Sequence, residues 1–283
     1  MIMVQAAGFS DIGKVRKANE DCFLLNEPIG LYVVADGMGG HRGGGIASRM
    51  AIETIDEYMA TPSQEPSEVD GAHTVEAQSS AANRLRQSIF LANQNIYNRS
   101  VADKACRGMG TTVSALYLAG NSIITANVGD SPVYLLRNGE IETLYTPHTL
   151  LHEREKIPKS LKGKFSIGKL AHILTRAVGI RSDVGVDLVE TPCFSDDIVV
   201  LCSDGLSGKI SREEIRDLVY QNDSQSACKK LTDLANQRGG EDNITVIVVR
   251  VTAANERPAN RLFERIVGIP AWIASLFSTK NRS

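Results

Sequence analysis

Five aspartates adjoin the ends of apolar segments that read as strands. Three of them follow such a segment and two precede one: Asp36, Asp130 and Asp204, then Asp21 and Asp242. Glu20 adds a sixth acid beside Asp21. In an antiparallel sheet the end of one strand lies beside the beginning of its neighbour. We therefore expect these acids to gather at one edge of a sheet.

Such a cluster requires a cation, because carboxylates a few ångströms apart raise one another's pKa. No histidine or thiol stands at metal-ligand spacing, so the donors are oxygens, which favour Mg²⁺, Mn²⁺ or Ca²⁺ over zinc. Two such ions, about 3.5–4 Å apart, can share a water and hold it for in-line attack on phosphorus. Arg16, four residues before Glu20, suits a phosphate, since its guanidinium binds phosphate oxygens in pairs.

Blocks of strands and blocks of helices must position these groups. The periodicity predicts strands at 21–26 and 31–35, then a helix at 44–60 and a second one carrying Leu85, Ile89, Ala92 and Ile96. Short strands separated by turn signals follow between 111 and 145. A strand ending near Asp204, two further helices and a last strand over 243–251 complete the chain. This order predicts an α+β fold in which antiparallel sheets pack together with helices outside.

Composition excludes several other classes of protein. The 283 residues are 42% hydrophobic and carry a formal net charge of −2, which offers no overall attraction for nucleic acid or an anionic membrane. The five cysteines are scattered and indicate neither a disulfide framework nor a zinc site. The first residues lack the pattern of a signal peptide. We expect a cytoplasmic protein.

Seven motifs occur in an order that resembles one family. They are SDIGKVRKANED (10 to 21), VVADGMGGH (33 to 41), GMGTT (108 to 112), ANVGDS (126 to 131), LTRAVG (174 to 179), VVLCSDGL (199 to 206) and EDNITVIVV (241 to 249). The chain resembles the metal-dependent protein phosphatases of the protein phosphatase 2C type, in their compact bacterial form, over about residues 8 to 252. The resemblance implies a four-layer α-β-β-α sandwich, with two central antiparallel sheets flanked by helix pairs, and hydrolysis of phosphoserine and phosphothreonine.

The resemblance also implies roles for single residues. In the family the aspartate matching Asp36 bridges two Mn²⁺ or Mg²⁺ ions, and the carbonyl matching Gly37 completes one ion's ligands. The positions of Asp204 and Asp242 bind one or both ions. By the same resemblance, Glu20 and Asp21 act directly or through water, Arg16 binds the substrate phosphate, and Asp130 with Asp204 holds a third, weaker ion. The nucleophile would be a metal-bridging hydroxide, without a covalent phosphoenzyme.

Three positions depart from the family pattern. Met38 stands where animal members often have a histidine, the general acid, and His41 is only a loose substitute. Pro132 replaces the arginine of GDSR, and Pro147 replaces the aspartate of DHS. These replacements leave the two-metal ligands in place but bear on the third ion and on local substrate contacts.

Three segments stand apart from the motifs: two lie within a phosphatase domain that spans 1–252, and the third is the tail that follows it. Residues 61–80 form a polar insertion, and the basic residues 147–172 fall at the family's flap, where they either meet acidic or phosphorylated partners or form a solvated loop. The tail, 253–283, has the apolar spacing of an amphipathic helix but is too short for a bilayer span. Packing on its own domain is the preferred interpretation of the tail, with a partner or a membrane surface as alternatives.

Phosphorylated proteins are the expected partners, plausibly a serine/threonine kinase and its targets, and we expect a monomer. Two other functions use the same residues. The first is an inactive regulatory module of the same fold, against which the intact Asp36, Asp204 and Asp242 argue. The second is a calcium-stabilised binding domain, in which Arg16 would have no role.

Overall fold

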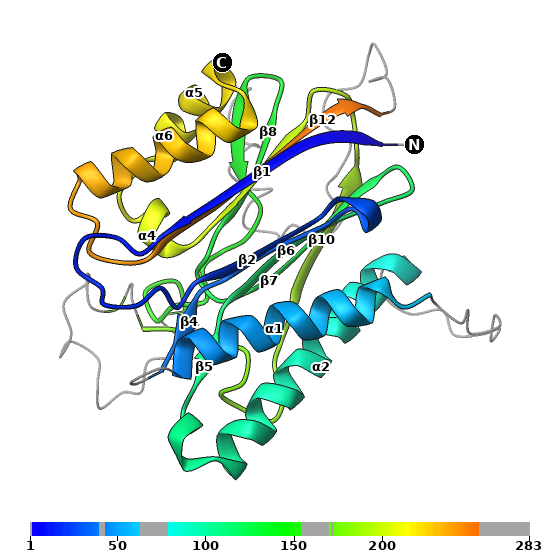
Figure 1. Ribbon diagram of the computed structural model, residues 1–283. Helices are drawn as coiled ribbons and strands as arrows, with labels where there is room; N and C mark the ends of the chain where they lie inside the picture. The colour runs from blue at the N-terminus through cyan, green and yellow to red at the C-terminus, as the bar shows by residue number, and fades with distance from the viewer. Residues whose placement is uncertain (1, 40–42, 63–78, 154–169, 171–172, 255–283) are drawn as a thin grey trace, which may run out of the picture.

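The computed structural model describes residues 2–39, 43–62, 79–153, 170 and 173–254. Figure 1 shows four layers, in which two sheets lie face to face and a pair of helices covers the outer face of each. Most of the polar insertion, most of the flap segment, the tail beyond residue 254 and His41 lie outside the described residues.

The first sheet is antiparallel and contains both the first and the last strand of the domain. Its order is β1 (Met3–Asp11), β12 (Ile244–Ala253), β11 (Ile198–Cys202), β8 (Val133–Arg137) and β9 (Glu140–Thr143). Its outer face is covered by α5 (Arg212–Gln221) and α6 (Ser224–Gln237).

The second sheet is also antiparallel and is built from the middle of the chain. Its order is β10 (Asp187–Pro192), β7 (Ser122–Val128), β6 (Val113–Ala119), β3 (Leu31–Ala35) and β2 (Cys22–Asn26). Its outer face is covered by α1 (Gly43–Ala60) and α2 (Ser80–Ala102). Short elements complete the chain: β4 (Gly37–Met38) paired with β5 (Gly110–Thr111), α4 (Asp204–Ser207), and two 3-10 turns, Glu27–Ile29 and Lys104–Cys106.

Burial on both faces explains why the central strands read as continuous apolar runs. In β3, Leu31 and Val33 pack against the helices, whereas Tyr32 and Val34 pack against the other sheet. All five residues of β3 are buried. Successive side chains of a strand point to opposite faces, so a strand covered on both sides needs apolar residues throughout.

Side-chain caps define where the helices begin. The Ser79 hydroxyl accepts a hydrogen bond from the Ala82 N–H at the start of α2. At α5, Ser211 and Glu214 form a reciprocal capping box, and Asp223 caps α6. Each cap satisfies a backbone donor that the first helical turn leaves unpaired.

The predicted fold is confirmed, but the sequence analysis did not predict two strands. Both β1 and β10 lie at the edges of their sheets. Edge strands have fewer buried neighbours than central ones, and Ala7 is the one buried residue of β1. Their apolar pattern is correspondingly weak.

Within the described residues, no helix is both long and apolar enough to span a bilayer.

Candidate active site

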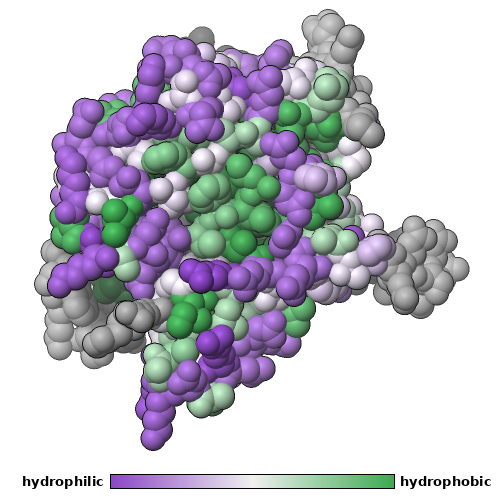
Figure 2. Space-filling model, in the orientation of Figure 1, coloured by the Kyte–Doolittle hydropathy of each residue, from purple (hydrophilic) through white to green (hydrophobic). Residues whose placement is uncertain are grey.

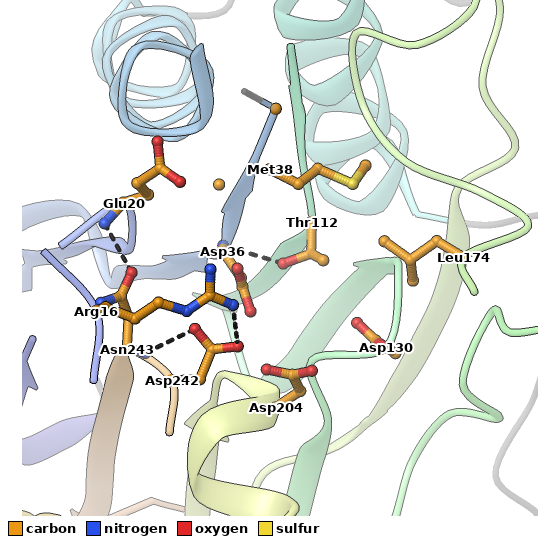
Figure 3. Close-up of a pocket in the computed structure, with 12 residues that line it drawn as sticks. Arg16, Glu20, Asp36, Met38, Thr112, Asp130, Leu174, Asp204, Asp242 and Asn243 are labelled. Carbon is orange, nitrogen blue, oxygen red and sulfur yellow. Dashed lines mark hydrogen bonds and ion pairs between the residues drawn. The ribbon is translucent and has the colours of Figure 1, made fainter. Parts of the chain in front are cut away.

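A pocket opens where the two sheets bring their acidic ends together. The carboxylates of Glu20, Asp36, Asp130, Asp204 and Asp242 line it, together with Arg16 and Gly37. Figure 3 shows that the four aspartates point into a common space, whereas the Glu20 carboxylate points away from them toward α1. The predicted convergence of acids is therefore confirmed for the residues that line this pocket.

Strand register explains the convergence. Cys22 pairs with Ala35, which places Asp21 beside Asp36 at one end of the β2–β3 pair. Asp204 begins α4 just after β11, and Asp242 precedes β12, which pairs antiparallel with β11. The end of one strand and the start of its neighbour therefore meet at the same edge, as the antiparallel pairing requires.

Backbone and hydroxyl hydrogen bonds fix the position of Asp36. Its N–H donates to Thr112 Oγ1 at 3.0 Å, and its carbonyl accepts from the Thr112 N–H at 2.8 Å and from Thr111 Oγ1 at 2.9 Å. The Thr112 hydroxyl also shares a hydrogen bond of 2.8 Å with Ser131 Oγ, next to Asp130. The sequence analysis assigned both threonines to a strand and missed this positioning role.

Asp21 lies behind the pocket rather than on its surface. Its Oδ2 accepts hydrogen bonds from Ser203 Oγ at 2.8 Å and from Thr245 Oγ1 at 2.7 Å. Burial, reinforced by the charges of Asp204 and Asp242, raises the pKa of Asp21 to about 6 despite the two hydroxyl donors. Asp21 thus ties β2 to the first sheet beneath the other carboxylates.

Asp36 lies in the pocket with other carboxylates around it. Burial is the main cause that raises the pKa of Asp36 well above its ordinary value, and the neighbouring carboxylates of Asp21, Asp204 and Asp130 raise it further. A buried carboxylate among like charges is stabilised in its ionised form by a cation. The donor set of carboxylate and carbonyl oxygens suits Mg²⁺ or Mn²⁺.

The side chains are not held in a finished ligand set. Within the described residues, no three acidic, histidine or cysteine side chains surround a common point closely enough to bind a metal ion together. One reason is visible in Figure 3, where Asp242 turns toward Arg16 and its Oδ2 lies 2.8 Å from Arg16 Nη2. The acids fit a divalent cation in chemistry and in shared location, and Asp242 must exchange its arginine partner to join them.

Arg16 lies on a loop that follows β1 and reaches across the pocket. Its side chain is 52% exposed, so about half of it stays accessible to solvent while it pairs with Asp242. Gly13 lets the loop pass close to the start of β12: its φ is +78°, and a Cβ there would lie 2.2 Å from the carbonyl oxygen of Asp242. Only glycine fits such a position.

Asn243, which directly precedes β12, holds this loop in place by hydrogen bonds. Its Nδ2 donates to the carbonyls of Ile12, at 2.9 Å, and Ala18, at 3.0 Å, while its Oδ1 accepts from the Glu20 N–H at 2.9 Å. One buried amide therefore bridges both ends of the segment that carries Arg16. The motif EDN contained the residue, but the sequence analysis assigned a role only to its aspartate.

We predict that Asn243→Ala weakens both stability and substrate binding. Three hydrogen bonds to a loop are lost, at about 1 kcal/mol each in net terms, and the buried backbone groups are left unpaired. The melting temperature should fall by several degrees, and KM for a phosphopeptide should rise more than kcat falls, because Arg16 loses its fixed position. Thermal unfolding and steady-state kinetics measure both. An Asn243→Ala enzyme with wild-type KM would contradict this role.

Gly37 is a second position at which two backbone segments pack closely against each other. A Cβ on Gly37 would lie 2.2 Å from the Gly44 carbonyl oxygen and 2.5 Å from that of Glu20. The turn after Asp36 can therefore pack against the start of α1 only if both residues are glycines. This packing places the Gly37 backbone at the pocket wall.

The loop that carries Asp130 is braced by a buried histidine. The ring Nδ1 of His148 accepts a hydrogen bond from the Gly129 N–H at 3.0 Å. The backbone N–H of His148 donates to the Gly129 carbonyl, also at 3.0 Å. On the other side, His148 Nε2 lies 3.0 Å from Asp187 Oδ2, and Arg176 Nη1 donates to Asp187 at 2.6 Å. These contacts hold the loop of Asp130 in place beside Pro147.

Comparisons with known proteins agree with this geometry. Residues 17–246 match the family model described as protein phosphatase 2C. A serine/threonine phosphatase of Listeria welshimeri is 34% identical over 244 residues, covering 85% of this chain and 93% of that protein. The protein phosphatase PhpP of Streptococcus pneumoniae is 33% identical over 250 residues, with 85% and 94% covered.

Solved structures show the same likeness in three dimensions. The serine/threonine phosphatase PstP of Mycobacterium tuberculosis superposes with a TM-score of 0.74 at 28% identity, covering 89% of this chain and 100% of that one. A catalytic domain of PstP with a TM-score of 0.73 and the same identity, over 89% and 100%, was solved with two manganese ions. The chain therefore belongs to the protein phosphatase 2C family and is a divalent-metal-dependent protein serine/threonine phosphatase.

Proposed function

We propose that this protein hydrolyses phosphoserine and phosphothreonine at the pocket formed by Asp36, Asp204 and Asp242, with two Mn²⁺ or Mg²⁺ ions as cofactors. The observation that carries the proposal is the position of Asp36, a partly buried carboxylate with a raised pKa, surrounded by other acids. In this proposal the two ions would be held by Asp36, Asp204, Asp242 and the Gly37 carbonyl, with Asp36 shared between them.

Three further acids have supporting roles in the proposal. Glu20 and Asp21 act through water: the Glu20 carboxylate points away from the four aspartates, and Asp21 lies behind them, bound to two hydroxyls. Asp130 and Asp204 together would hold a third, weaker ion. The support for the third site is that both carboxylates line the pocket and that the loop of Asp130 is braced by His148.

Divalent ions held by these residues supply Lewis-acid activation of water and neutralise charge on the phosphoryl group. The remaining tasks fall to the chain itself. Arg16 exchanges Asp242 for the phosphate oxygens and fixes the orientation of the ester, since its half-exposed guanidinium already lies over the pocket. Met38 lines the wall without a proton to donate, so solvent water protonates the leaving alkoxide.

Phosphorylated proteins are the substrates, and a serine/threonine kinase and its targets are the partners that this activity would oppose. We propose a cytoplasmic, monomeric enzyme. The similarity to bacterial serine/threonine phosphatases of Listeria welshimeri and Mycobacterium tuberculosis supports the substrate class.

The first test is hydrolysis of a phosphothreonine peptide in Mn²⁺, Mg²⁺, Ca²⁺ and chelator. We expect turnover with Mn²⁺ or Mg²⁺ and background rates with Ca²⁺ or chelator, because catalysis needs small, strongly polarising ions. Turnover in chelator would contradict the metal-dependent mechanism. A folded protein that is inactive with every ion would favour the regulatory module, and stabilisation by Ca²⁺ alone would favour the calcium-binding domain.

A further inference from the structure

An apolar strip runs along the open side of the sandwich, away from the helices. Here β1, the edge of one sheet, lies beside β2, the edge of the other. Partly buried apolar residues on and beside these strands pack against the core between the sheets and remain accessible from outside. We call them the seam: Ile2, Val4, Ala6, Phe23, Leu25 and Leu118.

Figure 2 shows this side of the molecule. Apolar side chains gather over β1 and the space between β1 and β2, and hydrophilic residues surround them. The Phe23 ring reaches from β2 to β1, where a Cβ on Gly8 would lie 2.6 Å from it. Unpaired edge strands that carry accessible apolar residues tend to bind other polypeptide segments, and proteins usually cover such edges.

The tail begins at one end of the seam and is long enough to cover it. Met3 pairs with Ala253, so the end of β12 delivers the tail beside the beginning of β1. The nine residues of β1 span about 30 Å at roughly 3.3 Å each. The first ten tail residues can cross about that distance when extended, and the remaining residues of 255–283 then suffice for several helical turns.

The composition of the tail matches the seam. Beyond Pro270, which suits the first turn of a helix, apolar residues recur at helical spacing: Trp272, Ile273, Leu276 and Phe277. The family match ends at residue 246, so this segment lies beyond the part that the family shares. We propose that residues 255–283 fold back and bind the seam through this apolar face, covering the edges of both sheets.

Trp272 is the one tryptophan of the chain, so its fluorescence reports the tail directly. We expect blue-shifted emission and weak acrylamide quenching in the full-length protein, compared with a free peptide of residues 255–283. Leu25→Glu places a charge in the seam and should return both signals to those of the peptide. The matched control is Leu91→Glu on α2, where the leucine is 38% exposed and outside the seam; it should leave both signals unchanged.

Phosphatase turnover of both variants shows that each is folded, and neither residue belongs to the pocket. Three outcomes would overturn the proposal. Trp272 in the full-length protein could be as exposed as in the peptide. Its shift could depend on protein concentration, which would indicate a second copy as the binding surface. It could appear only with vesicles of anionic phospholipid, which would indicate a membrane surface.

Discussion

Asp36→Asn should reduce kcat by about a thousandfold or more while making the metal-free protein more stable. Metal ions in such sites contribute several kcal/mol of charge stabilisation, and each 1.36 kcal/mol is a factor of about ten in rate. Asparagine keeps the size and the backbone hydrogen bonds to Thr111 and Thr112 but loses the charge that holds the ions. Turnover and Mn²⁺ binding by calorimetry measure the loss.

The gain in stability has a defined pH dependence. The folded-state pKa of Asp36 is raised, so the folded protein binds its proton more tightly than the unfolded chain does. Wild-type stability in chelator therefore falls as pH rises above 3.8, the ordinary aspartate value, and Asp21, whose pKa is also raised, adds to this loss up to about pH 6. The advantage of Asp36→Asn should widen over the same range.

Thermal unfolding in chelator at several pH values tests this prediction, and saturating Mn²⁺ provides the comparison. With Mn²⁺ the order should reverse, because ligand binding stabilises only the wild-type protein. Glu213→Gln on the exposed face of α5 is a suitable control, since it removes a carboxylate outside the pocket. If Asp36→Asn retained wild-type turnover, the bridging role of Asp36 would have to be abandoned.

Arg16→Ala should raise KM for a phosphopeptide by about 10- to 100-fold with a smaller effect on kcat. A hydrogen bond to a charged group contributes about 1.5–3 kcal/mol, and 1.4 kcal/mol corresponds to a factor of ten in affinity. The side chain is 52% exposed, so solvent screening places the effect toward the lower end of the range. Steady-state kinetics against peptide concentration measure it.

Arg16→Lys is the matched variant for this prediction. It keeps the charge but lacks the planar fork that binds two oxygens, so it should recover only part of the lost affinity. Lys17→Ala, one residue further along the same loop, should leave KM unchanged because Lys17 does not line the pocket. An equal effect of the Arg16 and Lys17 substitutions would indicate a general loss of positive charge instead of a specific phosphate contact.

The central strands and the acids of the pocket were predictable because each carries a local signal. The segments of β3 and β11 are apolar throughout, and an aspartate follows each one. Antiparallel topology then brings such acids together whatever the details of the loops. For this reason the pocket position of Asp36, Asp130, Asp204 and Asp242 could be predicted before the fold was known.

Residues that act through long-range hydrogen bonds gave no comparable signal. Asn243 contacts Ile12 and Ala18, more than 200 positions away in sequence, and an asparagine before a strand is equally typical of a turn. The enclosure of Asp21 by Ser203 and Thr245 likewise depends on three separate segments. Roles of this kind depend on register between distant strands, which one sequence does not specify.

The ion pair between Arg16 and Asp242 couples the two proposed ligands of the pocket. One carboxylate serves as the partner of the arginine and as a proposed ligand of a cation, so the two uses compete. A cation that takes Asp242 releases the guanidinium for the phosphate, and a phosphate that takes the guanidinium releases Asp242 for the cation. By thermodynamic reciprocity, each of the two then strengthens the binding of the other by the same factor. If both proposed roles hold, we expect cofactor and substrate to bind cooperatively, coupled through a single salt bridge.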